Sequence, residues 1–210
     1  MHLWFLLTGF GDSSLLLPAA AFIFLWLLYR RQRGMAWAWA GLFGTACVLT
    51  ALTKLAFMGW GIGIEALNFT GISGHSMLSG SVLPVLLALL VRERHQWRWL
   101  AAGLGALVAM LVGLSRLALD AHSPAEVIAG LSLGLCISGL FLALGSLRLP
   151  RLSPLLLALV IGVLSLQSVV GVHAPTHYLI QVIAAHLAGR DAAYQREDRY
   201  APLRPLIPAA

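Results

Sequence analysis

The chain has 210 residues, of which 60% are hydrophobic and only 10% are charged. A soluble domain usually carries about a quarter charged residues, so this composition excludes an ordinary soluble protein and indicates an integral membrane protein. The net charge of +6 comes from loop arginines without interleaved aromatic residues, a pattern typical of membrane topology and not of nucleic-acid binding.

Apolar runs along the chain predict an all-α bundle of about six transmembrane helices, because a spanning helix needs roughly 20 apolar residues. The six runs are Leu15–Tyr29, Met35–Met58, Met77–Val91, Trp99–Leu114, Glu126–Leu147 and Pro154–Val172. Another apolar stretch, Leu3–Phe10, comes before the first run, and Asp12 and Pro18 interrupt this region. The stretch is therefore either the beginning of the first span or an interfacial segment.

Arginines gather in alternate connections between these runs. The odd-numbered connections hold Arg30, Arg31, Arg33, Arg92, Arg94, Arg98, Arg148 and Arg151. The second connection holds no basic residue between Gly59 and Ser76, and the fourth holds only Arg116. The positive-inside rule then puts the odd connections in the cytoplasm and the even ones outside.

The end of the chain changes character after Val172. Tyr178–Leu187 has apolar residues at helical spacing and is expected to lie along the membrane surface. Residues 188–210 are polar and rich in proline, which predicts a loosely ordered tail. We therefore expect one membrane domain over residues 1–187, followed by a polar tail. His173, His177 and His186 are interpreted as interfacial residues rather than metal ligands.

The two outward connections and the end of the second run hold a set of polar residues that suits phosphate chemistry. Lys54 is the only lysine, and it lies about one turn from the outer end of its run. With Arg116 and the backbone N–H groups of the Ser73-Gly74-His75 turn, it would form a cationic, donor-rich cup for a phosphoryl group.

The histidines of these connections suit a two-step displacement, in which one attacks phosphorus and the other protonates the leaving oxygen. Glu126 follows His122 by four residues and would lie on the same side of a helix that begins near Pro124. A carboxylate in that position can hold the imidazole in its nucleophilic tautomer. Asp120 is left unassigned, because it could pair with Arg116 or face solvent.

These residues resemble the motifs of the type 2 phosphatidic acid phosphatase family of membrane lipid phosphatases, which is related to the vanadium haloperoxidases. Ser115-Arg116, five residues, His122, three residues and Glu126 match its third motif, with glutamate in place of aspartate. Ile72-Ser73-Gly74-His75 matches the second motif, with isoleucine in place of proline. Lys54 is the candidate for the first motif, but Gly61 stands where that motif has arginine.

The resemblance implies a role for each matching residue. His122 would be the nucleophile, Glu126 its orienting carboxylate and His75 the general acid. The phosphate-binding residues would be Lys54, Ser73, Gly74 and Arg116. No metal and no cofactor is needed, because cationic side chains stabilise the developing charge. The cation that the family has seven residues after its lysine is either missing here or supplied from elsewhere in the chain.

The expected function is hydrolysis of a lipid phosphomonoester or isoprenoid diphosphate through a phosphohistidine at the outer face. The partners would be that substrate and membrane lipids, and the oligomeric state is left open. The substrate is also open among an isoprenoid diphosphate such as undecaprenyl diphosphate, phosphatidylglycerol phosphate, phosphatidate and a lipid A phosphate. The arginine-rich, lysine-poor composition suggests a bacterial inner membrane, with the site facing the periplasm or exterior.

Two alternatives stand beside this hypothesis. The incomplete first motif would also fit an inactive relative that binds lipid phosphates. Gly71-Ile72-Ser73-Gly74 and Ala185-His186 with Gly189 resemble pieces of rhomboid intramembrane serine proteases. That second interpretation puts the histidine beyond the last clear span and leaves Arg116 and His122 unexplained.

Overall fold

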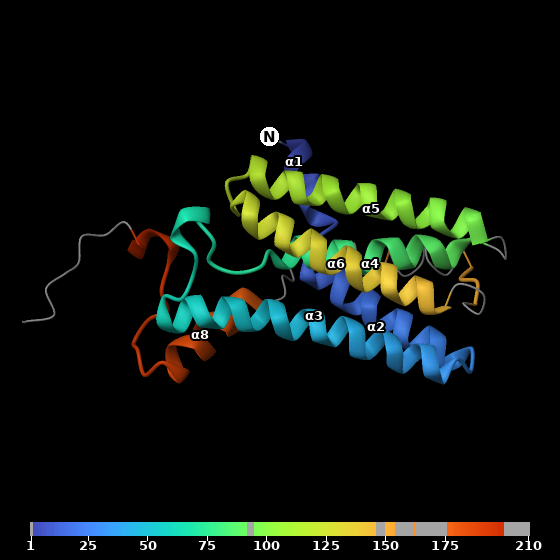
Figure 1. Cartoon of the computed structure of the whole chain (residues 1–210), viewed down its shortest axis with the longest axis horizontal. Coiled ribbons are helices and arrows are strands. Elements are labelled where there is room, and N and C mark those ends of the chain that lie inside the picture. Colours follow the sequence, from blue (N-terminus) through green and yellow to red (C-terminus); the bar gives the residue numbers. More distant parts are fainter. Residues whose placement is uncertain (1, 92–94, 146–149, 154–161, 163–175, 200–210) are drawn as a thin grey trace, which may run out of the picture.

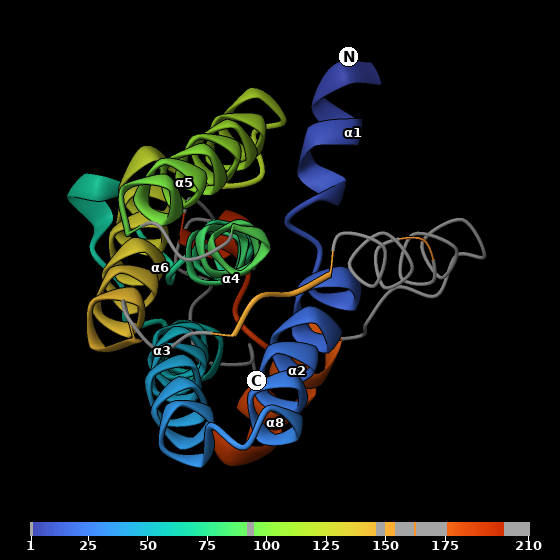
Figure 2. The ribbon, with the colours of Figure 1, turned by 90° about the vertical axis from the view of Figure 1, so that its right-hand side faces the viewer.

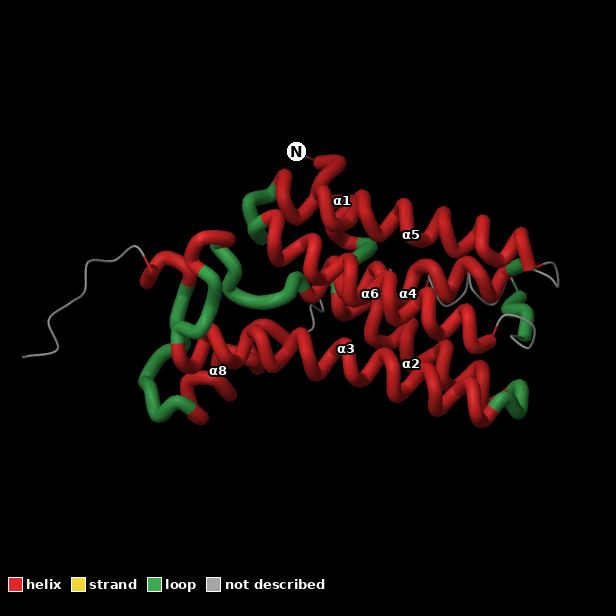
Figure 3. Tube along the Cα trace, viewed as in Figure 1, coloured by secondary structure: helices red, strands yellow, loops and turns green. Residues whose placement is uncertain are grey.

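The computed structural model describes residues 2–91, 95–145, 150–153, 162 and 176–199, and the regular structure in them is helical (Figures 1 and 3). The α-helices are α1 (His2–Gly9), α2 (Ser13–Tyr29), α3 (Arg33–Trp60), α4 (Gly74–Leu90), α5 (His95–Ala118), α6 (Pro124–Gly145) and α8 (Thr176–Leu187). The described residues also form two 3-10 turns, η1 (Glu65–Leu67) and η2 (Arg196–Arg199). The prediction of an all-α protein is confirmed.

Among the described residues, four helical segments are long and apolar enough to cross a membrane: Leu3–Tyr29, which comprises α1 and α2, Arg33–Trp60, Gln96–Ala118 and Pro124–Gly145. The apolar helix α4 has 17 residues, which at 1.5 Å per residue makes it about 25 Å long. Five of the six predicted runs therefore correspond to helices, and the sixth, Pro154–Val172, falls almost entirely outside the described residues.

The break between α1 and α2 has a local cause. Asp12 precedes α2 as its N-cap, and its Oδ1 accepts a hydrogen bond of 2.7 Å from the Ser14 backbone N–H. Such a cap satisfies a donor that would otherwise be unpaired at the helix start. The Leu3–Phe10 stretch thus forms a separate short helix, and α1 packs against α5.

Helix α4 lies in the middle of the bundle, and Figure 2 shows it between α2, α3, α5 and α6. Its core residues Val82 and Val85 are 0% exposed. By contrast, α5 exposes one stripe of leucines: Leu100, Leu104, Leu107, Leu111 and Leu114. Their alternating spacing of three and four residues puts them on one helix face. An exposed apolar face of this kind is suited to contact with lipid.

Small residues allow α4 and α6 to approach closely. A Cβ atom added to Gly134 of α6 would lie 2.4 Å from the Met77 carbonyl oxygen, and one added to Gly130 would lie 2.6 Å from the Ser73 carbonyl oxygen. The four-residue spacing of Gly130 and Gly134 is the small-residue pattern that lets membrane helices pack backbone to backbone. This contact sets the position of both helix starts, Gly74 and Pro124, next to each other.

We expect Gly134→Ala to lower the thermal unfolding midpoint in detergent, because the added methyl group would overpack the α4–α6 contact by about 1–3 kcal/mol. Gly139→Ala on the same helix is the matched control, since a Cβ at Gly139 meets nothing within 4 Å. Equal midpoints for the two variants would contradict the packing argument.

The C-terminal part of the described chain is more ordered than its composition suggests. Helix α8 packs on the last turns of α3. A Cβ atom added to Gly59 would lie only 3.3 Å from the Ala184 carbonyl oxygen, so glycine at this position allows the two helices to approach closely. Phe57, Met58 and Ala184 form a second small core there. The sequence predicts a loosely ordered tail from residue 188, but residues 188–199 make specific contacts, which are described below.

Candidate active site

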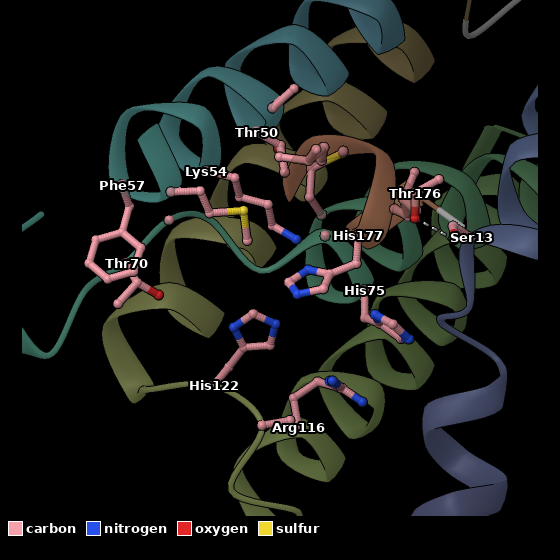
Figure 4. Close-up of a pocket in the computed structure, with 18 of the residues that line it drawn as sticks. Ser13, Thr50, Lys54, Phe57, Thr70, His75, Arg116, His122, Thr176 and His177 are labelled. Atoms are coloured by element: carbon pink, nitrogen blue, oxygen red, sulfur yellow. Dashed lines mark hydrogen bonds between the residues drawn. The ribbon is translucent and has the colours of Figure 1, made fainter. Parts of the chain in front are cut away.

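A cavity of about 460 Å³ lies where α3, the start of α4, the corner between α5 and α6, and α8 come together. In Figure 4 the side chains of Lys54, His75, Arg116, His122 and His177 surround a common space. Five of the seven predicted site residues line this cavity: Lys54, Gly74, His75, Arg116 and His122. Within the described residues, no cluster of three or more His, Cys, Asp and Glu side chains could hold a metal ion.

The corner between α5 and α6 fixes Arg116 relative to His122. Asp120 has a φ of 51°, and the Ala121 N–H donates back to the Arg116 carbonyl oxygen at 3.0 Å while the Asp120 N–H donates to Leu117. These two bonds form the left-handed C-cap known as a Schellman motif. Asp120, which the sequence left unassigned, is exposed and forms this cap.

The start of α6 is a capping box. Ser123 accepts from the Glu126 N–H at 3.4 Å, and the Glu126 carboxylate accepts from the Ser123 N–H at 3.1 Å. A serine followed three residues later by glutamate satisfies two otherwise unpaired donors at a helix start. The same carboxylate Oε2 lies 2.7 Å from His122 Nδ1, so the cap and the histidine pairing depend on one side chain.

Glu126 is completely buried, and all of its other partners are donors. Its Oε1 accepts from the Thr70 N–H at 2.7 Å and from the Thr70 hydroxyl at 2.6 Å, and its Oε2 accepts from Arg196 Nη2 at 2.7 Å. Because this carboxylate only accepts hydrogen bonds, the Nδ1 atom of His122 carries the proton and donates it in a hydrogen bond to Glu126. The Nε2 atom of His122 is then left with its lone pair available to the cavity.

Burial lowers the pKa of His122 below 6.5, while its hydrogen bond to Glu126 opposes that effect. The imidazole is therefore neutral at pH 7.

The segment before α4 brings the first backbone N–H groups of α4 close to Lys54. Gly71 has a φ of 144°, and a Cβ there would lie 3.0 Å from the Lys54 side chain; one on Gly74 would lie 3.6 Å from Lys54 Nζ. The positive φ and the close approach both require glycine at 71. The ammonium group and the positive end of α4 thus point to the same part of the cavity.

Ser73 is not in the cavity. It is 0% exposed, its N–H donates to the Glu126 carbonyl oxygen at 3.1 Å, and its hydroxyl oxygen accepts from the Ser76 hydroxyl at 3.0 Å. Its described contacts therefore tie the start of α4 to the start of α6. His186 is exposed and does not line the cavity either, so the two residues that the serine-protease alternative requires are not brought together.

The corner between α1 and α2 forms another wall near the cavity. Arg116 Nη1 donates to the Thr8 hydroxyl at 2.8 Å, and Asp12 Oδ2 lies 3.9 Å from His75 Nε2. Gly11 allows this approach, because a Cβ there would lie 2.5 Å from the Val112 side chain and 3.2 Å from that of His75. Sequence analysis noted Asp12 only as an interruption of an apolar region.

Sequence analysis also missed several polar residues of the cavity, among them Thr70, His177 and Arg196. His177 was expected at the interface. Burial lowers its pKa, and the charge of Lys54 contributes in the same direction. Figure 4 shows the His177 ring pointing into the same space as Lys54 and His122. No local pattern marks these residues, since Thr70 belongs to a loop and the other two follow the last clear apolar run.

We expect Glu126→Gln to lower the pKa of His122 further, because both the charge and the hydrogen bond of Glu126 raise it. The substitution should also lower the unfolding midpoint, since each hydrogen bond to a buried charge contributes about 1.5–3 kcal/mol. Nuclear magnetic resonance titration of the histidine side chains and thermal unfolding in detergent would measure the two effects.

The control for that experiment is Glu65→Gln in η1, where the carboxylate is exposed. An unchanged His122 pKa in Glu126→Gln would mean that the 2.7 Å contact does not govern the titration of the imidazole.

The chain is similar to several known proteins. A model of the PAP2 superfamily matches residues 59–149. The chain is 30% identical to phosphatidylglycerophosphatase B of Bacillus subtilis over 62% of this chain and 68% of that one. It is 41% identical to an uncharacterized 22.5 kDa protein in the cps region of Klebsiella pneumoniae, over 93% of this chain and 96% of that one.

A solved structure has the same fold. The PAP2-type phosphatidylglycerolphosphate phosphatase from Bacillus subtilis, a transmembrane protein, matches with a TM-score of 0.52 and 27% sequence identity. The match covers 68% of this chain and 75% of that one.

Proposed function

Because this chain belongs to the PAP2 superfamily, we propose that it is a membrane phosphatase that hydrolyses a lipid phosphomonoester or diphosphate through a phosphohistidine at His122. The observation that carries the proposal is the 2.7 Å contact between His122 Nδ1 and the buried Glu126 carboxylate at the wall of a cation-lined cavity. That pairing directs a basic nitrogen into a space that suits an anion.

The reaction has two steps. In the first, His122 Nε2 attacks phosphorus, a P–N bond forms, and the bond from phosphorus to the leaving oxygen breaks. His75, as the general acid, gives a proton to that oxygen. In the second step His75 accepts a proton from water, the water oxygen attacks phosphorus, the P–N bond breaks, and inorganic phosphate leaves. Glu126 keeps the Nδ1 proton in place and stabilises the positive charge that develops on the ring.

Cations around the cavity would stabilise the phosphoryl oxygens. Lys54, Arg116 and the first N–H groups of α4 are fixed before substrate arrives, which is the arrangement that contributes most to electrostatic catalysis. Because Ser73 is buried behind this wall, we propose that the backbone N–H groups of the turn, and not its hydroxyl, contact the phosphoryl group.

A lipid substrate is supported by the apolar part of the cavity lining. Leu17, Cys47, Ala51, Leu78 and Ile180 line it with apolar surface, and such a wall suits the portion of a lipid next to its head group. The Bacillus subtilis relative is a phosphatidylglycerophosphatase, so phosphatidylglycerol phosphate is the first substrate to test, with an isoprenoid diphosphate second.

An inactive, lipid-phosphate-binding relative is the second candidate function. It is favoured by Gly61, which stands where the family's first motif has arginine.

A measurement of phosphatase activity distinguishes the two functions. We expect purified protein in detergent to release phosphate from phosphatidylglycerol phosphate or from isoprenoid diphosphate, with a chelator present, and we expect His122→Ala to reduce this release by at least about 10³-fold. Folded protein without activity on these lipids or on phosphatidate would favour the binding function.

We also propose that the cavity faces the outside of a bacterial inner membrane. The positive-inside rule supports this orientation: Arg30, Arg31 and Arg33 lie at the connection between α2 and α3, and Figure 1 shows this connection at the opposite end of the bundle from α8.

In a variant with Cys47 and Cys136 replaced, a cysteine at Glu65 should react with a membrane-impermeant maleimide added to spheroplasts. A cysteine at Arg33 should react only after the membrane is permeabilised. Both positions are exposed in the folded chain, so the opposite labelling pattern would reverse the proposed orientation.

A further inference from the structure

The end of α3 is closed by a glycine where a first-motif arginine would be expected. Gly61 has a φ of 70° and forms the left-handed C-cap of α3. An arginine there would be held in a backbone conformation that L residues with side chains rarely adopt. A Cβ on Gly61 would also lie 3.6 Å from the ring of Tyr194. Position 61, at the end of α3, therefore carries no cation. It is covered by Tyr194 from the C-terminal segment, residues 188–199.

That segment is fixed by a series of specific contacts. Helix α8 ends at Leu187. Gly189 follows it with a φ of 63°, and the Arg190 N–H donates back to the Ala185 carbonyl oxygen at 2.9 Å, which together form a left-handed cap. The Arg190 guanidinium then lies 3.8 Å from the centre of the Tyr194 ring. The Tyr194 backbone N–H donates to the Met58 carbonyl oxygen at 2.8 Å. Residues 189–194 are therefore held against the last turn of α3.

Two residues further on, Arg196 reaches the centre of the site. Its Nη2 donates to Glu126 at 2.7 Å and lies 3.3 Å from the Thr70 hydroxyl oxygen. The side chain lines the same cavity as Lys54 and His122. Its hydrogen bonds to the described residues engage Nη2 alone, so the Nε and Nη1 donors remain available to a ligand. Guanidinium groups bind phosphate through several donors in one plane.

We propose that Arg196, carried by the C-terminal segment, supplies the phosphate-binding guanidinium that the end of α3 lacks. The inference rests on the proposed function. In this arrangement one donor of Arg196 holds the carboxylate that orients His122, while the others bind a phosphoryl oxygen. The C-terminal segment completes the site rather than being a loose tail.

The test measures binding of inorganic phosphate and hydrolysis of phosphatidylglycerol phosphate by the full chain in detergent. Arg196→Gln should weaken phosphate binding roughly 10- to 100-fold, because a hydrogen bond to a charged group contributes about 1.5–3 kcal/mol. KM should rise along with the loss of kcat. Arg33→Gln removes the same charge from the exposed start of α3 and should bind phosphate as the unsubstituted chain does.

Arg196→Lys is the second test variant, to be used if Arg196→Gln fails to fold. It keeps a cation beside Glu126 but lacks the planar set of donors, so it should fold and still bind phosphate more weakly. Unchanged phosphate affinity in a folded Arg196→Gln or Arg196→Lys variant would overturn the proposal. Faster hydrolysis by Arg196→Gln would also overturn it, since Arg196 would then block the cavity.

Failure of this proposal is distinguishable from failure of the proposed function. If the chain hydrolyses no lipid but loses phosphate binding in Arg196→Gln, the role of Arg196 stands and the phosphatase assignment fails. If hydrolysis depends on His122 but phosphate affinity is unchanged in Arg196→Gln, the phosphatase assignment is supported and the proposal for Arg196 is wrong.

Discussion

The site depends on the Glu126 carboxylate, which is completely buried and accepts five hydrogen bonds, from Thr70, His122, Ser123 and Arg196. A buried carboxylate without such donors would be strongly disfavoured in a membrane protein. Each donor comes from a different structural context: a loop, a helix corner, a helix cap and the C-terminal segment. Satisfying this one charge therefore fixes four parts of the chain relative to one another, and the orientation of the His122 imidazole follows from it.

The small residues between α4 and α6 make this arrangement possible. Gly130 and Gly134 let the two helices approach until the Ser73 N–H can donate to the Glu126 carbonyl oxygen. The N-terminal ends of α4 and α6 then lie side by side, with His75 on one and Glu126 on the other. Helix dipoles that end together in this way favour an anion between them. The packing of the apolar helices and the pairing of two helix N-termini that suits an anion are thus consequences of the same contact.

The C-terminal segment adds a contribution that an isolated bundle would lack. It binds to the last turn of α3 through Tyr194 and Met58 and reaches Glu126 through Arg196. Because this contact joins residues 70 positions apart in the chain, its geometry depends on how α8 packs on Gly59 and Ala184. A change in that packing would be felt in the cavity, although α8 itself provides only His177 and a few further side chains to the lining.

The sequence by itself determined the helical architecture, because uninterrupted apolar runs can satisfy their backbone in a membrane only as helices. It also determined the local pairing of His122 with Glu126, since a spacing of four residues across a helix start permits few other geometries. Only the tertiary structure decided that Ser73 is buried, that Asp120 serves as a helix cap, and that Thr70, His177 and Arg196 line the cavity. Those outcomes depend on contacts between distant segments, and no local period or spacing encodes them.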